Sequence, residues 1–139
     1  MTQPSSRGFT LIELMVIILI IGLLAGFVAP KVFQTGEDAK RKIAATDIDN
    51  IITILDRYKL SNGAYPSTEQ GLKALIEKPT TPPIPTNWQK GGYVRKLPRD
   101  PWARPYQYLN TGSDSIYLYS QGPKKDSEDD DIGNKVSEE

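Results

Sequence analysis

One stretch near the N-terminus constrains the fold of this chain more than any other. Residues 9–29 read FTLIELMVIILIIGLLAGFVA, which is 21 residues with a single charged side chain, Glu13. At about 1.5 Å of rise per residue, such a helix is roughly 31 Å long, enough to cross the hydrocarbon core of a bilayer. The rest of the 139-residue chain is too short and too polar to bury this helix on every side. We therefore interpret residues 9–30 as a transmembrane helix rather than a buried core helix.

The N-terminal region of the chain does not resemble an ordinary secretory signal. Such a signal is cleaved at small residues after its apolar region, and Ala25-Gly26 lacks the Ala-x-Ala pattern. A small residue, Gly8, instead comes directly before the apolar stretch. Cleavage after Gly8 would leave the apolar segment on the mature protein, which would begin at Phe9. Charge leaves the orientation open, because the positive-inside rule is weak for long translocated domains.

Glu13 is the most informative single residue. A carboxylate inside an apolar helix costs a few kcal/mol in lipid unless it is neutralised or paired. One interpretation is a protonated glutamic acid that reaches toward the interface. The other is an ion pair with the new α-amino group of Phe9 in a neighbouring subunit. Such a pair would fix the register between subunits, because an unpaired buried charge is penalised far more than a paired one.

The remaining chain predicts an α+β fold. Apolar residues recur three and four positions apart and mark one face of a second helical segment: Ala44, Ile48, Ile51, Ile52, Leu55 and Tyr58. With a kink at Pro30, a single helix of about 50 residues could run from Phe9 to Leu60 and end at Ser61-Asn62-Gly63.

Shorter elements follow this long helix. Ser67 and Gln70 form a possible capping box for a short helix to about Lys78 that buries Leu72, Leu75 and Ile76. Four prolines make residues 79–92 a loop, and residues 106–109 and 116–120 resemble the two strands of a hairpin. The sequence thus predicts a long helix, half transmembrane and half amphipathic, packed on a small antiparallel sheet with a long irregular loop.

Composition argues against an enzyme. The chain has no cysteine and no histidine, which excludes disulfides and removes the commonest general base. No serine–lysine pair or carboxylate pair is singled out by its spacing. Charge is strongly segregated, because residues 126–139 hold seven acids and one lysine, so that the tail carries −6 and residues 1–125 carry +6. Such a tail is either solvated or, in its compact part, a source of oxygen ligands for a hard cation.

A basic segment with interleaved aromatic residues is a pattern that can indicate a nucleic-acid site. Its members are Lys90, Arg95, Lys96, Arg99 and Arg104, with Tyr93, Trp102 and Tyr106. Nothing in the pattern places them on one groove, so we predict no nucleic-acid partner. Trp88 and Trp102 are expected to pin the loop to the core, and the basic residues could contact the acidic tail of a neighbouring subunit.

The segment Arg7-Gly8-Phe9-Thr10-Leu11-Ile12-Glu13-Leu14 resembles the leader of type IV pilins and pseudopilins. Longer matches resemble the major, or G-type, pseudopilins of type II secretion systems. They are Tyr65-Pro66-Ser67-Thr68-Glu69-Gln70-Gly71-Leu72, Gly92-Tyr93-Val94, Leu97-Pro98, Asp100-Pro101-Trp102 and Asp130-Asp131-Ile132-Gly133-Asn134.

This resemblance implies a type IV pilin-like fold and a mode of action. A prepilin peptidase would remove residues 1–8 by cutting after Gly8, and Phe9 would be N-methylated. Residues 9–30 would anchor the chain in the inner membrane with a cytoplasmic N-terminus, and residues 31–139 would form a periplasmic domain. The subunit would polymerise with itself into a pseudopilus that drives folded proteins across the outer membrane. Further partners implied are minor pseudopilins and the inner-membrane assembly platform.

The resemblance also implies a calcium site in the acidic loop. The expected ligands are the backbone carbonyl of Gln121 and the carboxylates of Asp130 and Asp131. Lys124 departs from the family pattern, because it stands where the first aspartate is expected, and Asp126 is the available substitute.

Two other classes of protein stay open. One is a minor pseudopilin or a type IV pilin of an adhesion or motility filament, for which the missing cysteine is unfavourable. The other is a membrane-anchored enzyme or binding domain, which would be monomeric and would keep its leader.

Overall fold

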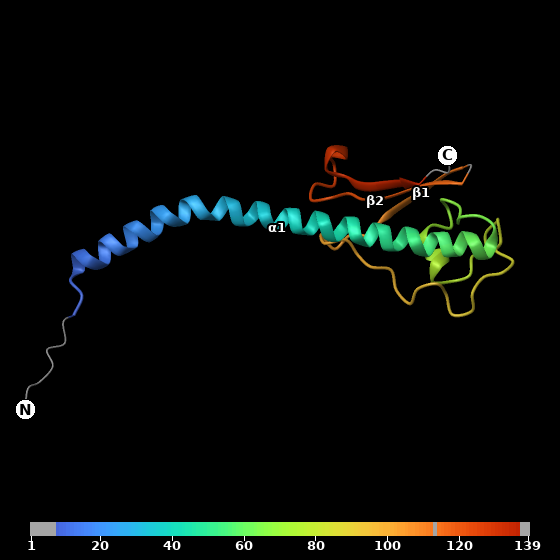
Figure 1. Cartoon of the computed structure of the whole chain (residues 1–139), viewed down its shortest axis with the longest axis horizontal. Coiled ribbons are helices and arrows are strands. Elements are labelled where there is room, and N and C mark those ends of the chain that lie inside the picture. Colours follow the sequence, from blue (N-terminus) through green and yellow to red (C-terminus); the bar gives the residue numbers. More distant parts are fainter. Residues whose placement is uncertain (1–7, 113, 137–139) are drawn as a thin grey trace, which may run out of the picture. The chain divides into compact units, whose positions relative to one another are not determined.

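The structure is a computed structural model that describes residues 8–112 and 114–136. Its elements are α1 (Leu11–Asn62), η1 (Leu72–Leu75), β1 (Gln107–Gly112), β2 (Ser115–Ser120), η2 (Glu128–Asp130) and β3 (Ile132–Val136) (Figure 1). The chain divides into two compact units, Met1–Asp38 and Ala39–Glu139. A long helix with a small antiparallel sheet confirms the predicted α+β class.

The predicted long helix is confirmed as α1, which continues through Pro30. Its C-terminal end has the expected chemistry. Gly63 takes a positive φ of 84° and its N–H donates to the Lys59 carbonyl at 2.7 Å.

In the first unit, the large apolar side chains from Leu11 to Phe27 are exposed on the single chain. Among the described residues, no helix reaches the length and apolarity that crossing a membrane requires. The predicted boundaries at residues 8 and 30 stay predictions.

The sheet has the strand order β1-β2-β3, and both pairings are antiparallel. The predicted hairpin is confirmed, with Tyr108 opposite Leu118 and a bulge between Asn110 and Gly112. The third strand was not predicted, because residues 132–136 were assigned to the acidic tail. This strand pairs with β2 from Ile116 opposite Val136 to Ser120 opposite Ile132.

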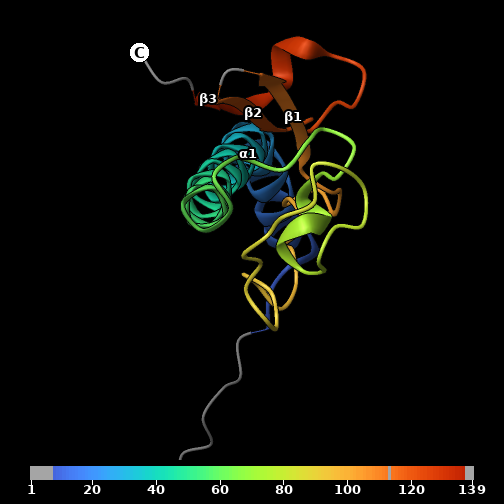
Figure 2. The ribbon, with the colours of Figure 1, turned by 90° about the vertical axis from the view of Figure 1, so that its right-hand side faces the viewer.

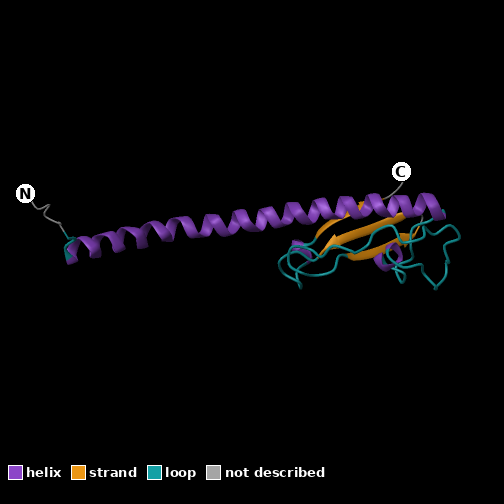
Figure 3. Cartoon of the chain, turned by 90° about the horizontal axis from the view of Figure 1, so that it is seen from below, coloured by secondary structure: helices purple, strands orange, loops and turns teal. Residues whose placement is uncertain are grey.

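The C-terminal half of α1 lies along one face of this sheet (Figures 2 and 3). Ile48, Ile51 and Leu55 are at most 1% exposed and belong to one core with Ile116 and Leu118 of β2. This confirms the predicted apolar face. It also explains the alternation along β2, whose intervening tyrosines at 117 and 119 stack on each other with ring centroids 4.9 Å apart.

The segment between helix and sheet corrects one prediction. The capping box exists, because the Gln70 N–H donates to Ser67 Oγ at 3.1 Å and the Ser67 N–H donates to Gln70 Oε1 at 3.0 Å. The helix that follows is only the 3₁₀ turn η1, not a helix to Lys78. Gly71 has a φ of 57°, which breaks the helical backbone between the box and η1. Ile76 is consequently only half-buried.

Residues 79–92 contain no helix or strand, as predicted. Trp88 pins this loop to the core, because its Nε1–H donates to the Ala74 carbonyl at 2.9 Å and its ring meets Tyr93 edge-on.

Candidate functional site

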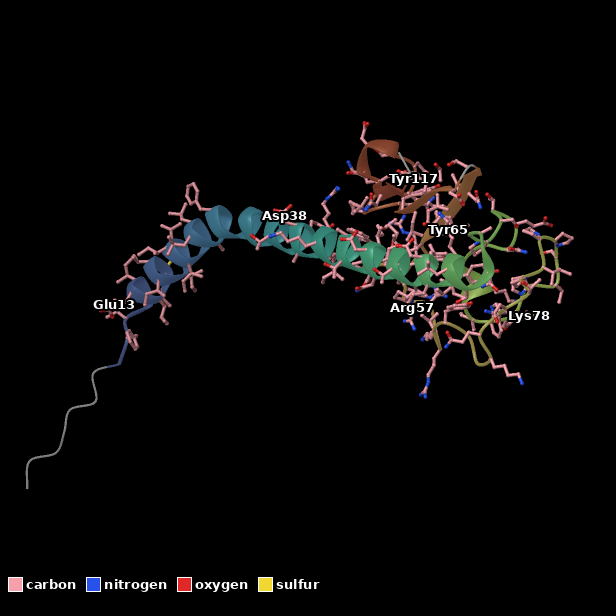
Figure 4. The ribbon with its side chains drawn as sticks, turned by 45° about the vertical axis from the view of Figure 1, so that its right-hand side comes forward. Glu13, Asp38, Arg57, Tyr65, Lys78 and Tyr117 are labelled. Atoms are coloured by element: carbon pink, nitrogen blue, oxygen red, sulfur yellow. The ribbon has the colours of Figure 1, made fainter. Side chains whose placement is uncertain are left out.

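Helix α1 begins with a reciprocal capping box that involves the predicted assembly residue, Glu13 (Figure 4). Its Oε2 accepts the Thr10 N–H at 2.8 Å and the Thr10 hydroxyl at 3.1 Å. In return, the Glu13 N–H donates to Thr10 Oγ1 at 3.3 Å. The carboxylate therefore has partners in its own helix while the chain is single. Sequence reasoning missed this pairing, although Thr10 and Glu13 have capping-box spacing.

The surroundings of Glu13 are apolar. Phe9, Ile12, Val16 and Ile17 line one shallow surface pocket with it. Gly8 is exposed and Phe9 is 76% exposed, so the predicted cleavage bond lies on the surface. An acid set among apolar side chains close to the predicted cleavage bond is the arrangement that the ion-pair hypothesis requires. The pair itself would join two chains, and nothing in a single chain tests it.

The predicted calcium ligands lie in the loop between β2 and β3, but they are not gathered. Asp126 is exposed, Gln121 and Asp131 are half-buried, and Asp130 pairs with Arg41 of α1 at 2.7 Å. Within residues 8–112 and 114–136, no group of three or more acidic, histidine or cysteine side chains could hold a metal ion. As placed, these residues do not fit a calcium site. Calcium binding stays an untested prediction.

A buried aspartate that the sequence indicated only as part of a motif organises the chain next to this loop. Asp100 is 4% exposed. Its Oδ1 accepts the N–H groups of Trp102 at 3.0 Å and Arg104 at 2.7 Å, and its Oδ2 accepts the Ser120 hydroxyl at 2.6 Å. Asp100 thus fastens a tight turn to the end of β2.

The basic segment divides into two groups. Arg104 and Arg99 bind carbonyl groups of their own chain, at Gly122 and Ala103 respectively. Lys90, Arg95 and Lys96 are exposed. The suggested contact between the basic segment and a neighbouring acidic tail therefore applies to these three residues at most.

Comparisons with known proteins settle the family. Residues 31–139 match the family described as type II secretion system (T2SS), protein G. The chain belongs to the type II secretion system protein G family. Residues 3–29 match the prokaryotic N-terminal methylation motif, so the segment with Gly8, Phe9 and Glu13 is recognised separately.

Two relatives align with this chain over almost its whole length. The type II secretion system core protein G of Pseudomonas aeruginosa is 50% identical over 139 residues, covering 96% of this chain and 98% of the relative. The core protein G of Escherichia coli K12 is 46% identical over 130 residues, covering 92% and 90%.

A solved structure agrees with the fold. The major pseudopilin from the type 2 secretion system of enterohaemorrhagic Escherichia coli is 46% identical and superposes with a TM-score of 0.67. The match covers 73% of this chain and 87% of that chain. The predicted type IV pilin-like fold and the resemblance to major pseudopilins are both confirmed.

Proposed function

We propose that this chain is the structural subunit that polymerises into the pseudopilus of a type II secretion system. The observation that carries the proposal is the protein G match over residues 31–139, joined to a methylation motif over residues 3–29. Members of this family are structural subunits rather than enzymes. The chain therefore acts by assembling into the pseudopilus, and this assembly drives the export of folded proteins.

Maturation prepares the subunit for assembly. A prepilin peptidase cuts between Gly8 and Phe9, and the new N-terminal amine is methylated. The cut creates a cation at Phe9, four positions before Glu13 in the sequence. In the fibre, the carboxylate of Glu13 then exchanges its Thr10 partners for the Phe9 amine of the next subunit. The exposed apolar side chains from Leu11 to Phe27 pack against those of other subunits.

Location and partners follow from the same proposal. The apolar segment of residues 9–30 holds the subunit in the inner membrane before assembly, with its N-terminus in the cytoplasm. Residues 31–139 lie in the periplasm, where the pseudopilus forms. Its partners are other copies of the chain, minor pseudopilins and the inner-membrane assembly platform. The methylation motif over residues 3–29 supports this placement.

A secretion assay tests the proposal. The gene is deleted in its native host, and a substrate of the type II system is measured in the medium and in the periplasm. We expect the substrate to accumulate, folded, in the periplasm, and the wild-type gene to restore export. Normal export combined with loss of surface filaments or motility would contradict the proposal and favour a type IV pilin.

A further inference from the structure

The loop between β2 and β3, residues 121–131, is closed by contacts of its own chain. We propose that two arginines, Arg104 and Arg41, hold this loop in place where the family resemblance expects a calcium ion. The proposal concerns the stability of one loop and goes beyond the function proposed above.

Arg104 holds the start of the loop. Its guanidinium donates to the Gly122 carbonyl. The backbone of Arg104 is itself fixed, because its N–H donates to Asp100 Oδ1 at 2.7 Å and its carbonyl accepts the Asp100 N–H at 2.8 Å. Since Asp100 also accepts the Ser120 hydroxyl, the arginine is built onto the strand end from which the loop departs.

Arg41 holds the end of the loop. Its Nη2 lies 2.7 Å from Asp130 Oδ1, and the two side chains are 36% and 21% exposed. The Asp130 N–H donates to the Ser127 carbonyl at 3.1 Å, so the aspartate is fixed within η2. A charge-assisted hydrogen bond at this distance ties the last turn before β3 to helix α1.

The two ends of the loop also touch each other. Gly122 has a φ of +65°, and a Cβ placed there would lie 2.0 Å from the Asp130 carbonyl oxygen. The residues that close the loop, Gly122 and Asp130, are thus the same two that bind the arginines. The loop is therefore closed by the close approach of Gly122 to the backbone of Asp130. Each of these two residues also binds one arginine.

The charges of the loop favour arginine over a metal ion. Lys124 stands where the family pattern expects a ligand, and Lys124 and Lys125 are both exposed cations of the same loop. The carboxylate of Asp130 is already bound to the guanidinium of Arg41. This positive charge would repel a divalent cation placed at the same carboxylate. Arg41 supplies the positive charge that pairs with Asp130.

Hydrogen exchange of the full-length protein in detergent tests the proposal. Amide exchange is followed in peptides from residues 121–132, in EDTA and in about 1 mM CaCl₂, a concentration at which extracellular calcium modules bind. We expect the same exchange in both solutions for the wild type. We expect Arg41→Gln to speed exchange in this segment by about fivefold or more, because losing about 1 kcal/mol of local stability changes the open population by that factor.

The control is Lys42→Gln, which removes an exposed cation from the next position of α1 and should leave exchange unchanged. Faster exchange of the wild type in EDTA, reversed by calcium, would overturn the proposal, as would an Arg41→Gln variant with full protection of the loop. The wild-type comparison needs no variant, so the test holds even if Arg41→Gln fails to fold. Since the readout is exchange, its outcome is independent of the secretion assay.

Discussion

Gly122 shows at the scale of one residue how closely this chain packs its backbone. It combines a left-handed φ of +65° with the close approach of the Asp130 carbonyl. Gly63 offers a matched comparison, because its φ of +84° is also left-handed but nothing lies within 4 Å of a Cβ there. The two positions therefore separate backbone strain from steric contact.

We predict that Gly122→Ala lowers the free energy of unfolding by about 3 kcal/mol and Gly63→Ala by about 1 kcal/mol. Urea denaturation of both variants measures the difference. Equal losses at the two positions would show that the contact between residues 122 and 130 contributes nothing.

Gln70 is a second residue with a larger role than its motif indicated. It is 7% exposed, and besides its part in the capping box its Nε2 donates to the carbonyls of Thr81 at 2.6 Å and Pro83 at 2.9 Å. One side chain thus holds the start of the irregular loop.

We predict that Gln70→Ala costs about 2 kcal/mol of stability, because it removes several hydrogen bonds from a buried amide. The exposed Gln89 provides the control, and Gln89→Ala should stay within about 0.5 kcal/mol of wild type in the same denaturation experiment. A loss for Gln70→Ala no larger than for the control would contradict this role.

Local spacing made Gln70 predictable as a cap, since the box spans only three residues. Its bonds to residues 81 and 83 depend on how a proline-rich loop folds back, which no local pattern encodes. The same holds for Arg41 and Asp130, which are 89 positions apart. The candidate assembly residue Glu13, by contrast, can be singled out from the sequence alone, because an acid in an apolar stretch stands out without any knowledge of the fold. Its role in assembly stays a prediction.

At the scale of elements, two tyrosines at the start of β1 join this strand to α1 and to the segment that follows α1. The Tyr106 hydroxyl donates to Asp47 of α1 at 2.9 Å, and the Tyr108 hydroxyl donates to the Pro66 carbonyl at 2.7 Å. Burial is the main cause that raises the pKa of both phenols well above 10. In the folded chain these groups keep their protons under conditions in which the unfolded chain loses them.

This difference predicts the alkaline limit of stability. The contribution of the two phenols is complete below the unfolded pKa of about 10 and is lost as the pH rises above it. Urea midpoints measured across this range should fall above about pH 10. The fall should be shallower in the double variant Tyr106→Phe/Tyr108→Phe, and an identical slope in wild type and variant would contradict the assignment.

The helix and the hairpin were predictable because each carries its own periodicity over many residues. Strand β3 was not, because Gly133, Asn134 and Lys135 have low strand propensity and follow an acidic run. Pairing with β2 imposes the strand. Gly133 in fact suits it, because a Cβ there would lie 2.7 Å from the Tyr117 hydroxyl and 2.8 Å from the Tyr119 Cβ.

At the scale of the whole molecule, assembly depends in our proposal on what pairs with the carboxylate of Glu13. In the single chain the carboxylate of Glu13 accepts hydrogen bonds from Thr10. In the fibre, we propose that the amine of a neighbouring subunit takes the place of Thr10. On this proposal, cleavage after Gly8 and assembly are separate steps, and only assembly requires the charge.

We predict that Glu13→Gln is still cleaved and methylated but yields at least about tenfold less fibre, as expected when an ion pair worth more than 1.4 kcal/mol is lost. Immunoblots of sheared fibres and of whole cells measure assembly and processing. Glu69→Gln, at an exposed acid of the second unit, is the control and should assemble normally. If Glu13→Gln gave the wild-type fibre yield, the ion pair would not be required for assembly.

The most direct test of the central claim is the intact mass of the subunit in fibres sheared from cells that express the complete secretion system. The account predicts a polymer whose subunit lacks residues 1–8 and begins at N-methylated Phe9. A chain that keeps Met1 to Gly8 and is recovered only as a monomer would contradict it.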